Sequence, residues 1–304
     1  MVSIPGSAYG FQVRSSQPLQ FLRRGGGGET LDVHVNGESP ALPNHPPLLE
    51  WDLRDDGRDV RAQLYRHALG FQFRIAGGTA CLIDPRNRTI HLTKDPAASL
   101  WELGLWGLPA LLCFTYRGDL ALHAAAVEVN GGAVLFGAPG RHGKTTLALA
   151  FHRSGHRVLS EDLACCRLTP QPAILPGPAL LRLRPDMYDG AAPTGTRLVS
   201  TRHDRIYLEL DEERRGSGAP VPIRAIVLLQ ESIDGVRLQR VGGANALPDL
   251  WALSFRIPGE RALHRNFTQL TQLLTKVPVW NLRRPLSRAG LDLTVARVLE
   301  AFGS

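Results

Sequence analysis

The glycine-rich segment at residues 137–149, GAPGRHGKTTLAL, constrains the fold more than any other stretch of this sequence. It follows the apolar run 133–136 and overlaps a helix-forming run at 145–151. A strand, a glycine-rich turn, a lysine, two threonines and a helix form the layout of a phosphate-binding loop, in which backbone N–H groups turn inward onto phosphate oxygens. The sequence therefore predicts that a nucleotide binds at this loop.

The residues of the loop suggest how the nucleotide is held. Lys144 would reach the β- and γ-phosphates, and Thr145 would offer its hydroxyl to Mg²⁺. The start of the helix adds a dipole that favours an anion. The nucleotide-binding candidates are Ala138, Pro139, Gly140, Arg141, His142, Gly143, Lys144, Thr145 and Thr146. We expect ATP or GTP together with Mg²⁺, and the sequence leaves the choice of nucleotide open.

The loop departs from the usual spacing at its first glycine. About four residues normally separate that glycine from the Gly-Lys pair, and the matching position here is Ala138, one residue after Gly137. Either alanine replaces the glycine, which is tolerable where positive φ is not needed, or the loop is one residue longer. Arg141 and His142 stand where small residues are common, and either contact with phosphate or exposure to solvent accounts for them.

Composition limits the class of protein. The chain has 304 residues, enough for one large domain or two ordinary ones, and 43% are hydrophobic, as a globular core requires. No apolar run of about 18 residues is present, so we expect no membrane span. The N-terminal segment lacks the order of a signal peptide. The four cysteines show no metal-ligand spacing, and together these features favour the cytoplasm.

The net charge is +7, which suggests an anionic partner, although a compositional bias toward arginine explains it equally well. The arginines are dispersed, and no basic stripe alternates with aromatic residues. We therefore expect no nucleic-acid partner.

The pattern of apolar residues divides the chain into two units. Residues 1–108 are expected to form a small β-rich N-terminal domain, and residues 109–304 an α/β domain that carries the loop. Strands are predicted in the first unit at 11–14, 31–35, 64–75, 79–83 and 89–92, followed by a helix over 96–112 that is interrupted near Pro109. Nothing in this first unit carries obvious chemistry.

The second unit is organised around the loop. A strand at 120–129 and a return strand at 133–136 lead into it, and a helix over 144–152 follows. The remaining strands are predicted at 158–159, 206–210, 223–229 and 278–282, the helices at 245–251, 261–274 and 291–302, and a mobile loop at 189–204.

Three side chains near the loop are candidates for catalysis. Glu161 and Asp162 follow the strand at 158–159, and a carboxylate at a strand end beside a phosphate loop suits Mg²⁺ or an attacking hydroxyl. His123 lies on the strand that feeds the loop, where an imidazole could stabilise charge or move a proton. A histidine facing the core is the alternative for His123.

This segment resembles the catalytic core of bacterial HPr kinase/phosphorylase and, more closely, the wider group of HPr-kinase-related kinases. The matching elements are Leu122–His123, the loop at 137–146, Gly-His-Arg at 155–157 and the acidic pair at 161–162. The resemblance implies a P-loop, HPr-kinase-like kinase that transfers phosphate from a nucleotide to a hydroxyl, usually serine, of a protein or peptide. It implies a base from the acidic pair, with Asp162 as base or Mg²⁺ ligand beside Thr145, and Glu161 as the alternative base.

The sequence also departs from that family. Glu161 stands where the family has aspartate, which moves the carboxylate by one methylene, and no Glu-Ile-Arg-Gly segment is present, so we do not expect phosphorylase activity. Shorter relatives include kinases encoded with lasso-type ribosomal peptides, which makes a precursor-peptide serine one candidate acceptor. A nucleotide-binding regulatory module without transfer activity and a small-molecule hydroxyl kinase are the alternatives. The resemblance also leaves a homo-oligomer open.

Overall fold

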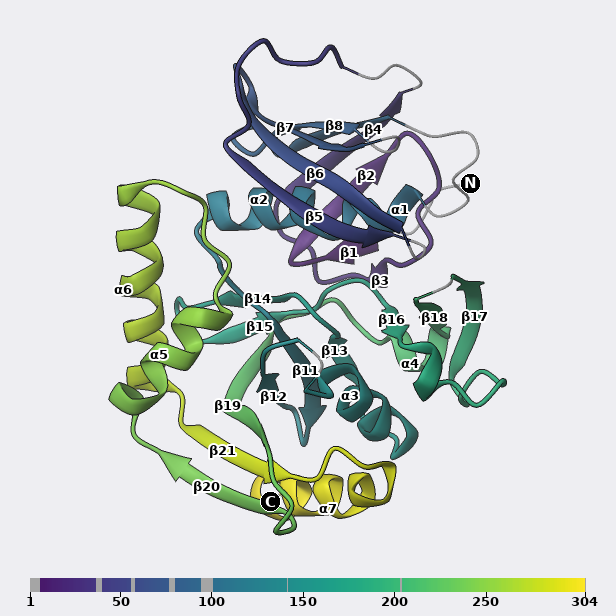
Figure 1. The fold of residues 1–304 in the computed structure, drawn as a ribbon, viewed down its shortest axis with the longest axis vertical. Coiled ribbons are helices and arrows are strands. Elements are labelled where there is room, and N and C mark those ends of the chain that lie inside the picture. The colour runs from purple at the N-terminus through teal and green to yellow at the C-terminus, as the bar shows by residue number, and fades with distance from the viewer. Residues whose placement is uncertain are drawn as a thin grey trace.

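The computed structural model describes residues 6–36, 40–55, 58–76, 80–93, 101–140, 142–202 and 204–303. The fold is mixed α/β, with a β-rich N-terminal part above a second layered part (Figure 1). The four cysteines, Cys81, Cys113, Cys165 and Cys166, are buried and free. In the described ranges, no helix is long and apolar enough to cross a membrane.

The N-terminal part is a nine-stranded sheet in the order β3-β1-β2-β4-β9-β8-β7-β6-β5. Its strands are β1 (Gly6–Ala8), β2 (Phe11–Ser15), β3 (Arg23–Arg24), β4 (Thr30–Asn36), β5 (Leu49–Asp55), β6 (Arg58–His67), β7 (Gly70–Ile75), β8 (Ala80–Asp84) and β9 (Thr89–Thr93). The strand predicted at 64–75 is instead the end of β6, a turn and β7, because Gly70 adopts a φ of 145° that closes a hairpin. The Gly77–Gly78 turn and residue 79 lie outside the described residues.

Two helices, α1 (Trp101–Leu105) and α2 (Leu108–Arg117), follow this sheet. The interruption predicted near Pro109 is confirmed, and Pro109 itself lies in the first turn of α2, where its missing N–H costs no helical hydrogen bond. The break falls at residues 106–107, and residues 96–100 of the predicted helix lie outside the described part. The buried side of α2 belongs to the same hydrophobic cluster as the N-terminal sheet. The predicted boundary at residue 108 stays a prediction.

The second sheet is built around the long strand β19 (Val221–Glu231). The strands follow the order β10-β14-β15-β19-β12-β11-β13, and β21 joins β20 to β19. They are β10 (Leu120–Leu122), β11 (Ala124–Val129), β12 (Gly132–Gly137), β13 (Val158–Ser160), β14 (Ala164–Arg167), β15 (Ala173–Leu175), β20 (Arg237–Val241) and β21 (Val279–Arg284). The strands β12, β19 and β21 run parallel. The first is buried throughout and the second over most of its length, as their apolar runs predict, whereas β21 is half buried.

Helices cover both faces of this sheet (Figure 1). On β12, Val134 and Phe136 face α3 (Lys144–Arg153) and α7 (Leu291–Phe302). The alternate residue Leu135 faces α5 (Gly243–Leu253) and α6 (Glu260–Lys276). These helices confirm the predicted ones, and the strand alternation explains why both layers are needed to cover the sheet.

A third, three-stranded sheet contains β16 (Leu180–Leu183), β18 (Ile206–Leu210) and β17 (Thr196–Thr201) in that order. The strand β17 falls in the segment predicted as a mobile loop at 189–204, so that prediction was wrong for these residues. Its half-exposed, polar sequence gives little strand signal, and it is the backbone pairing with β18 that orders it. The short elements η1 (Pro185–Met187), α4 (Glu212–Arg215) and η2 (Arg288–Gly290) complete the described fold.

Candidate active site

The predicted strand, loop and helix are present as β12, residues 138–143 and α3. Gly137 is the last residue of β12 and pairs with Ala124, and a Cβ there would lie 2.9 Å from Leu253. Gly137 is therefore needed for strand packing, and the loop begins at the buried Ala138. Gly143, the residue before α3, has a φ of 77°, which glycine adopts without strain.

The loop candidates lie together at the start of α3. Pro139 and Gly140 are exposed, and the Gly140 carbonyl oxygen lies 2.9 Å from His142 Nδ1. Thr146 lies in the first turn of α3 and is half-buried. Arg141 lies outside the described residues.

Lys144 is buried across the mouth of this loop. Its ammonium donates to the carbonyl oxygens of Ala138, at 2.7 Å, and Pro139, at 3.2 Å. It also lies 2.9 Å from Nε2 of His123. Because an ammonium has no acceptor, Nε2 must accept this bond, and the neutral imidazole then carries its proton on Nδ1.

His123 interrupts the strand predicted at 120–129. It lies between β10, which pairs with β14, and β11, which pairs with β12. Its backbone N–H donates instead to the carbonyl oxygen of Leu253 at 2.8 Å. Its ring packs edge-on against Phe255, with ring centroids 6.0 Å apart. The alternative of an ordinary core histidine does not fit, because the side chain is 27% exposed and reaches Lys144.

The acidic pair lies directly after β13 and its two members point to different partners. Glu161 is buried and accepts a hydrogen bond from the hydroxyl of Thr145. Asp162 is 38% exposed, and its Oδ1 lies 3.2 Å from Nδ1 of His123. The two atoms are within ion-pair distance but are not aligned for a hydrogen bond. Among the described residues, Nδ1 has no hydrogen-bond partner.

Arg182 on β16 joins the two carboxylates. Its Nε donates to Glu161 at 2.9 Å, and its Nη2 donates to Asp162 at 3.1 Å. Arg182 was not among the predicted site residues, because it lies in a proline-rich stretch about twenty positions from the acidic pair and has no motif of its own. The only signal was its alternation with apolar neighbours in LLRL, which places one polar side chain on the opposite face of a strand.

Burial and charge perturb the titration of these groups. Burial raises the pKa of Glu161 above its usual range, although the Arg182 charge opposes the shift. Burial lowers the pKa of His123 and of Lys144. Burial disfavours the charged form of Arg182 as well, but the charges of Glu161 and Asp162 outweigh burial and hold the pKa of Arg182 above its usual range. Opposite shifts in one small site are typical of functional centres.

Arg284, at the end of β21, contacts the backbone of the loop. It is 1% exposed, and its Nη2 donates to the carbonyl oxygens of His142, at 3.2 Å, and Gly143, at 3.3 Å. A Cβ on Gly143 would lie 2.3 Å from that nitrogen, so a larger residue there would displace Arg284 as well as strain the backbone. No local pattern predicts this contact, because it joins residues about 140 positions apart.

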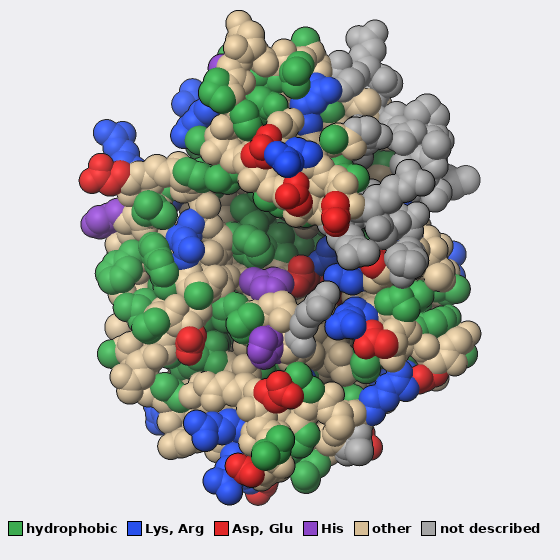
Figure 2. Space-filling view, in the orientation of Figure 1, with side chains coloured by type: hydrophobic (Ala, Val, Ile, Leu, Met, Phe, Trp, Pro, Cys, Tyr) green, Lys and Arg blue, Asp and Glu red, His purple; other side chains and the backbone are tan. Residues whose placement is uncertain are grey.

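These residues open onto one face of the molecule. In Figure 2 a histidine, an acidic side chain and a basic side chain meet in a hollow near the centre of this face, with hydrophobic side chains above them. The Gly-His-Arg segment at 155–157 is not part of the site. It follows the C-terminal end of α3, where Arg157 pairs with Glu128 at 3.0 Å.

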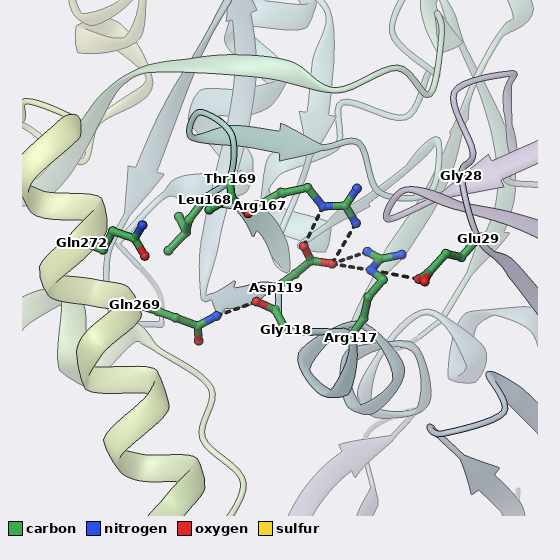
Figure 3. A pocket seen from close by; sticks show the side chains of 10 residues that line it. All are labelled: Gly28, Glu29, Arg117, Gly118, Asp119, Arg167, Leu168, Thr169, Gln269 and Gln272. Carbon is green, nitrogen blue, oxygen red and sulfur yellow. Dashed lines mark hydrogen bonds and ion pairs between the residues drawn. The ribbon is translucent and has the colours of Figure 1, made fainter.

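A separate cavity of about 490 Å³ lies at the far end of β14 (Figure 3). Asp119 at its centre is 4% exposed and is paired with Arg167 at 3.0 Å and with Arg117. The charges that line this cavity are therefore largely satisfied by one another, and none of the predicted site residues lies in it.

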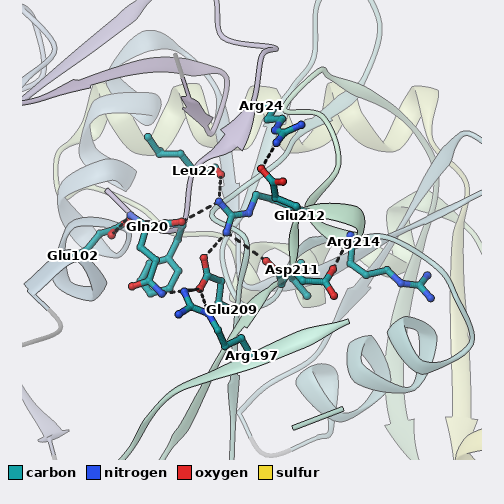
Figure 4. Close-up of polar contacts among 12 residues, drawn as sticks. Gln20, Leu22, Arg24, Glu102, Arg197, Glu209, Asp211, Glu212 and Arg214 are labelled. Carbon is teal, nitrogen blue, oxygen red and sulfur yellow. Dashed lines mark hydrogen bonds and ion pairs between the residues drawn. The ribbon is translucent and has the colours of Figure 1, made fainter. Parts of the chain in front are cut away.

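The three-stranded sheet that contains Arg182 is joined to the N-terminal part by a buried carboxylate (Figure 4). Glu209 on β18 is 4% exposed and accepts hydrogen bonds from Gln20, at 2.6 Å, from Arg197 and from Arg215. Because β18 pairs with β16, this network also fixes the strand of Arg182. The N-terminal sheet thus contributes to the geometry of the site without lining it.

Comparisons with known proteins add little to this geometry. No family model matches the sequence, and no curated protein matches it. Among solved structures, the chain is similar to the HPr(Ser) kinase/phosphatase from Coxiella burnetii, with 10% identity, 60% of this chain and 99% of that chain covered, and a TM-score of 0.33. Likeness of this size carries no argument about activity, so function has to be derived from the side chains of this chain.

Proposed function

We propose that the chain is a kinase that transfers the γ-phosphate of ATP to a serine hydroxyl of a peptide or protein. The observation that carries the proposal is one connected set of side chains at the mouth of the phosphate loop. It consists of Lys144, His123, Asp162, Arg182, Glu161 and Thr145, each in contact with the next. A site that only binds a nucleotide does not need a half-exposed carboxylate facing outward from this set.

The loop and Lys144 would hold the β- and γ-phosphates. The backbone amides at the start of α3 and the ammonium of Lys144 provide positive charge where phosphate oxygens would lie. Positioning and neutralisation of charge supply most of the catalysis in such transfers.

The oxygen atoms of Thr145 and Glu161 suit Mg²⁺. Among the described residues, no cluster of three or more His, Cys, Asp or Glu could hold a metal by itself. That fits Mg²⁺, which usually takes only one or two protein ligands and completes its shell with nucleotide phosphates and water. When bound there, Mg²⁺ would neutralise charge on the phosphates.

Asp162 is the proposed base. It would accept the proton of the serine hydroxyl while the serine oxygen bonds to the γ-phosphorus and the bond from the γ-phosphorus to the bridging oxygen breaks. Its exposure leaves it open to an acceptor, whereas Glu161 is buried against Thr145. The ring of neutral His123 lies 3.2 Å from Asp162 on one side, and Arg182 adds positive charge from the other.

The choice of serine, and of precursor peptides of the lasso type among the acceptors, rests on the motif resemblance. The test is incubation of the purified protein with Mg²⁺, labelled ATP and a panel of serine-containing peptides, followed by mass spectrometry. We expect a gain of one phosphate on serine. Tight ATP binding without transfer to any peptide would favour a small-molecule acceptor or a regulatory module, and absence of ATP binding would contradict the proposal altogether.

A further inference from the structure

A groove of about 670 Å³ separates the N-terminal sheet from the start of α6. One wall is formed by the β6–β7 and β8–β9 turns, and the other by residues 257–262 and Arg265. Apolar side chains line it from both sides, including Leu69, which is 52% exposed, and Tyr116, which is 46% exposed. Large exposed apolar side chains gathered in one groove indicate a binding surface.

Four exposed arginines line the same groove, namely Arg66, Arg86, Arg261 and Arg265. None of them makes an ion pair with a carboxylate in the part of the chain that the structure describes. Arg66 lies over the Phe71 ring, and Arg86 lies 3.5 Å from the hydroxyl of Tyr116. In Figure 2 a basic side chain stands at the top of α6 beside an acidic one, and further basic side chains stand on the facing side of the N-terminal sheet, at the upper left.

The two acidic residues of the lining offset only part of the charge of the four arginines. Asp84 is 7% exposed, and its two oxygens accept hydrogen bonds from the backbone and side chain of Asn87 at 3.0 and 2.8 Å. Glu260 is the other carboxylate of the lining. The cavity of Figure 3 differs from the groove in this respect, because its arginines, Arg117 and Arg167, are both paired with Asp119. The groove therefore has unbalanced positive charge that complements an anionic ligand.

The groove is linked to the candidate active site through neighbouring residues. Ile257, Ala262 and Arg265 line both this groove and a small pocket that Phe255 also lines. The Phe255 ring packs against the ring of His123. A chain lying in the groove would therefore pass the edge of the site that holds Asp162.

We propose that this groove binds an acidic segment of the peptide substrate and so delivers its serine to Asp162. The arginines would pair with Asp or Glu side chains of that segment, and Leu69 and Tyr116 would contact its apolar residues. The proposal deepens the proposed kinase function and rests on it for the identity of the ligand as a substrate, but the binding itself can be measured separately.

The first experiment measures binding to the whole protein by fluorescence anisotropy. The probe is a labelled peptide of alternating Glu and Leu with one Ser, and the reference peptide has Gln in place of Glu. Reversing two charges, Arg261→Glu with Arg265→Glu, is expected to weaken binding of the Glu peptide about tenfold or more, with little effect on the Gln peptide. The matched control is Arg237→Glu with Arg240→Glu, two exposed arginines of β20.

Equal affinity of the groove variant and wild type for the Glu peptide would overturn the proposal. If the β20 control variant weakened binding of the Glu peptide equally, the proposal would also be overturned, because the peptide would then be attracted by the net charge of the protein alone. A single-stranded oligonucleotide serves as competitor, and groove-dependent binding of the oligonucleotide without binding of the peptide would assign the groove to nucleic acid instead. All four arginines of the two variants are exposed, so unchanged thermal unfolding is expected and checked by circular dichroism.

The second experiment separates this proposal from the kinase proposal. It uses an acidic peptide that the protein phosphorylates. The groove variant should have a KM for this peptide about tenfold higher than that of wild type, with kcat and the KM for ATP unchanged. Arginine-dependent binding without any phosphate transfer would support the groove and contradict the kinase function. Transfer with an unchanged peptide KM in the groove variant would support the kinase function and contradict the groove.

Discussion

The hydroxyl of Thr145 donates a hydrogen bond to Oε1 of Glu161, which joins the first turn of α3 to the end of β13. This contact brings the two oxygen donors that suit Mg²⁺ to one point, while Asp162, one residue on, is directed to His123. The acidic pair is therefore split between two partners, because consecutive side chains after a strand leave the backbone in different directions.

Lys144→Ala is expected to lower kcat at least about a hundredfold, because it removes the cation placed over the loop where charge develops in the transfer. The measurement is steady-state phosphate transfer with Mg²⁺ and ATP. Lys276→Ala is the control, since Lys276 is exposed at the end of α6. Wild-type turnover by the Lys144 variant would show that the loop does not hold the transferred phosphate.

Asp162→Asn is expected to lower kcat about a hundredfold or more and to leave the affinity for Mg²⁺–ATP nearly unchanged, because it removes a base but no phosphate contact. Glu161→Gln should instead weaken Mg²⁺-dependent nucleotide binding, since it changes the carboxylate bonded to Thr145. Calorimetric titration of both variants with ATP, with and without Mg²⁺, distinguishes the two roles. Full activity in the Asp162 variant would leave Glu161 as the base.

Arg182→Gln is expected to move the acid limb of the kcat/KM profile to higher pH. Burial raises the pKa of Glu161, so its protonation begins at a higher pH than that of an ordinary glutamate, and the Arg182 charge limits that rise. Without the Arg182 charge, the pKa of Glu161 rises further, so the carboxylate becomes protonated at a still higher pH. The measurement is a pH–rate profile of the variant beside Arg184→Gln, a control whose arginine pairs only with Asp186 among the described residues. An unmoved limb would show that Glu161 does not control it.

Glu209→Gln is expected to destabilise the protein by about 3 kcal/mol, because it removes a buried negative charge that pairs with Arg215, whose side chain is 19% exposed, and with Arg197. Thermal or urea unfolding measures the change. Glu212→Gln is the control, because Glu212 makes an exposed pair with Arg24, and such pairs contribute little. We also expect kcat to fall in the Glu209 variant even under conditions where it is folded, since β18 positions the strand of Arg182. Unchanged stability and unchanged kcat together would contradict this role of the network.

Local patterns were enough for much of the fold. The loop between β12 and α3, the helices α5, α6 and α7 and the strands β18, β19 and β21 were all indicated by period and by glycine position. The errors fell where pairing decides structure. The strand β17 has no apolar face of its own, and the strand predicted at 120–129 is broken at His123 because its two halves pair with different neighbours.

Local patterns in the sequence locate the predicted phosphate loop, the acidic pair that follows the next strand and a histidine before the loop. These depend on residues close together in the chain, where turn, helix start and strand end follow from local chemistry. By contrast, only long-range packing brings Arg182 to both carboxylates, Arg284 to the loop, and arginines of the N-terminal sheet and α6 to one groove. Such contacts join segments far apart in the sequence, and they form because burying the sheets against one another brings those segments together.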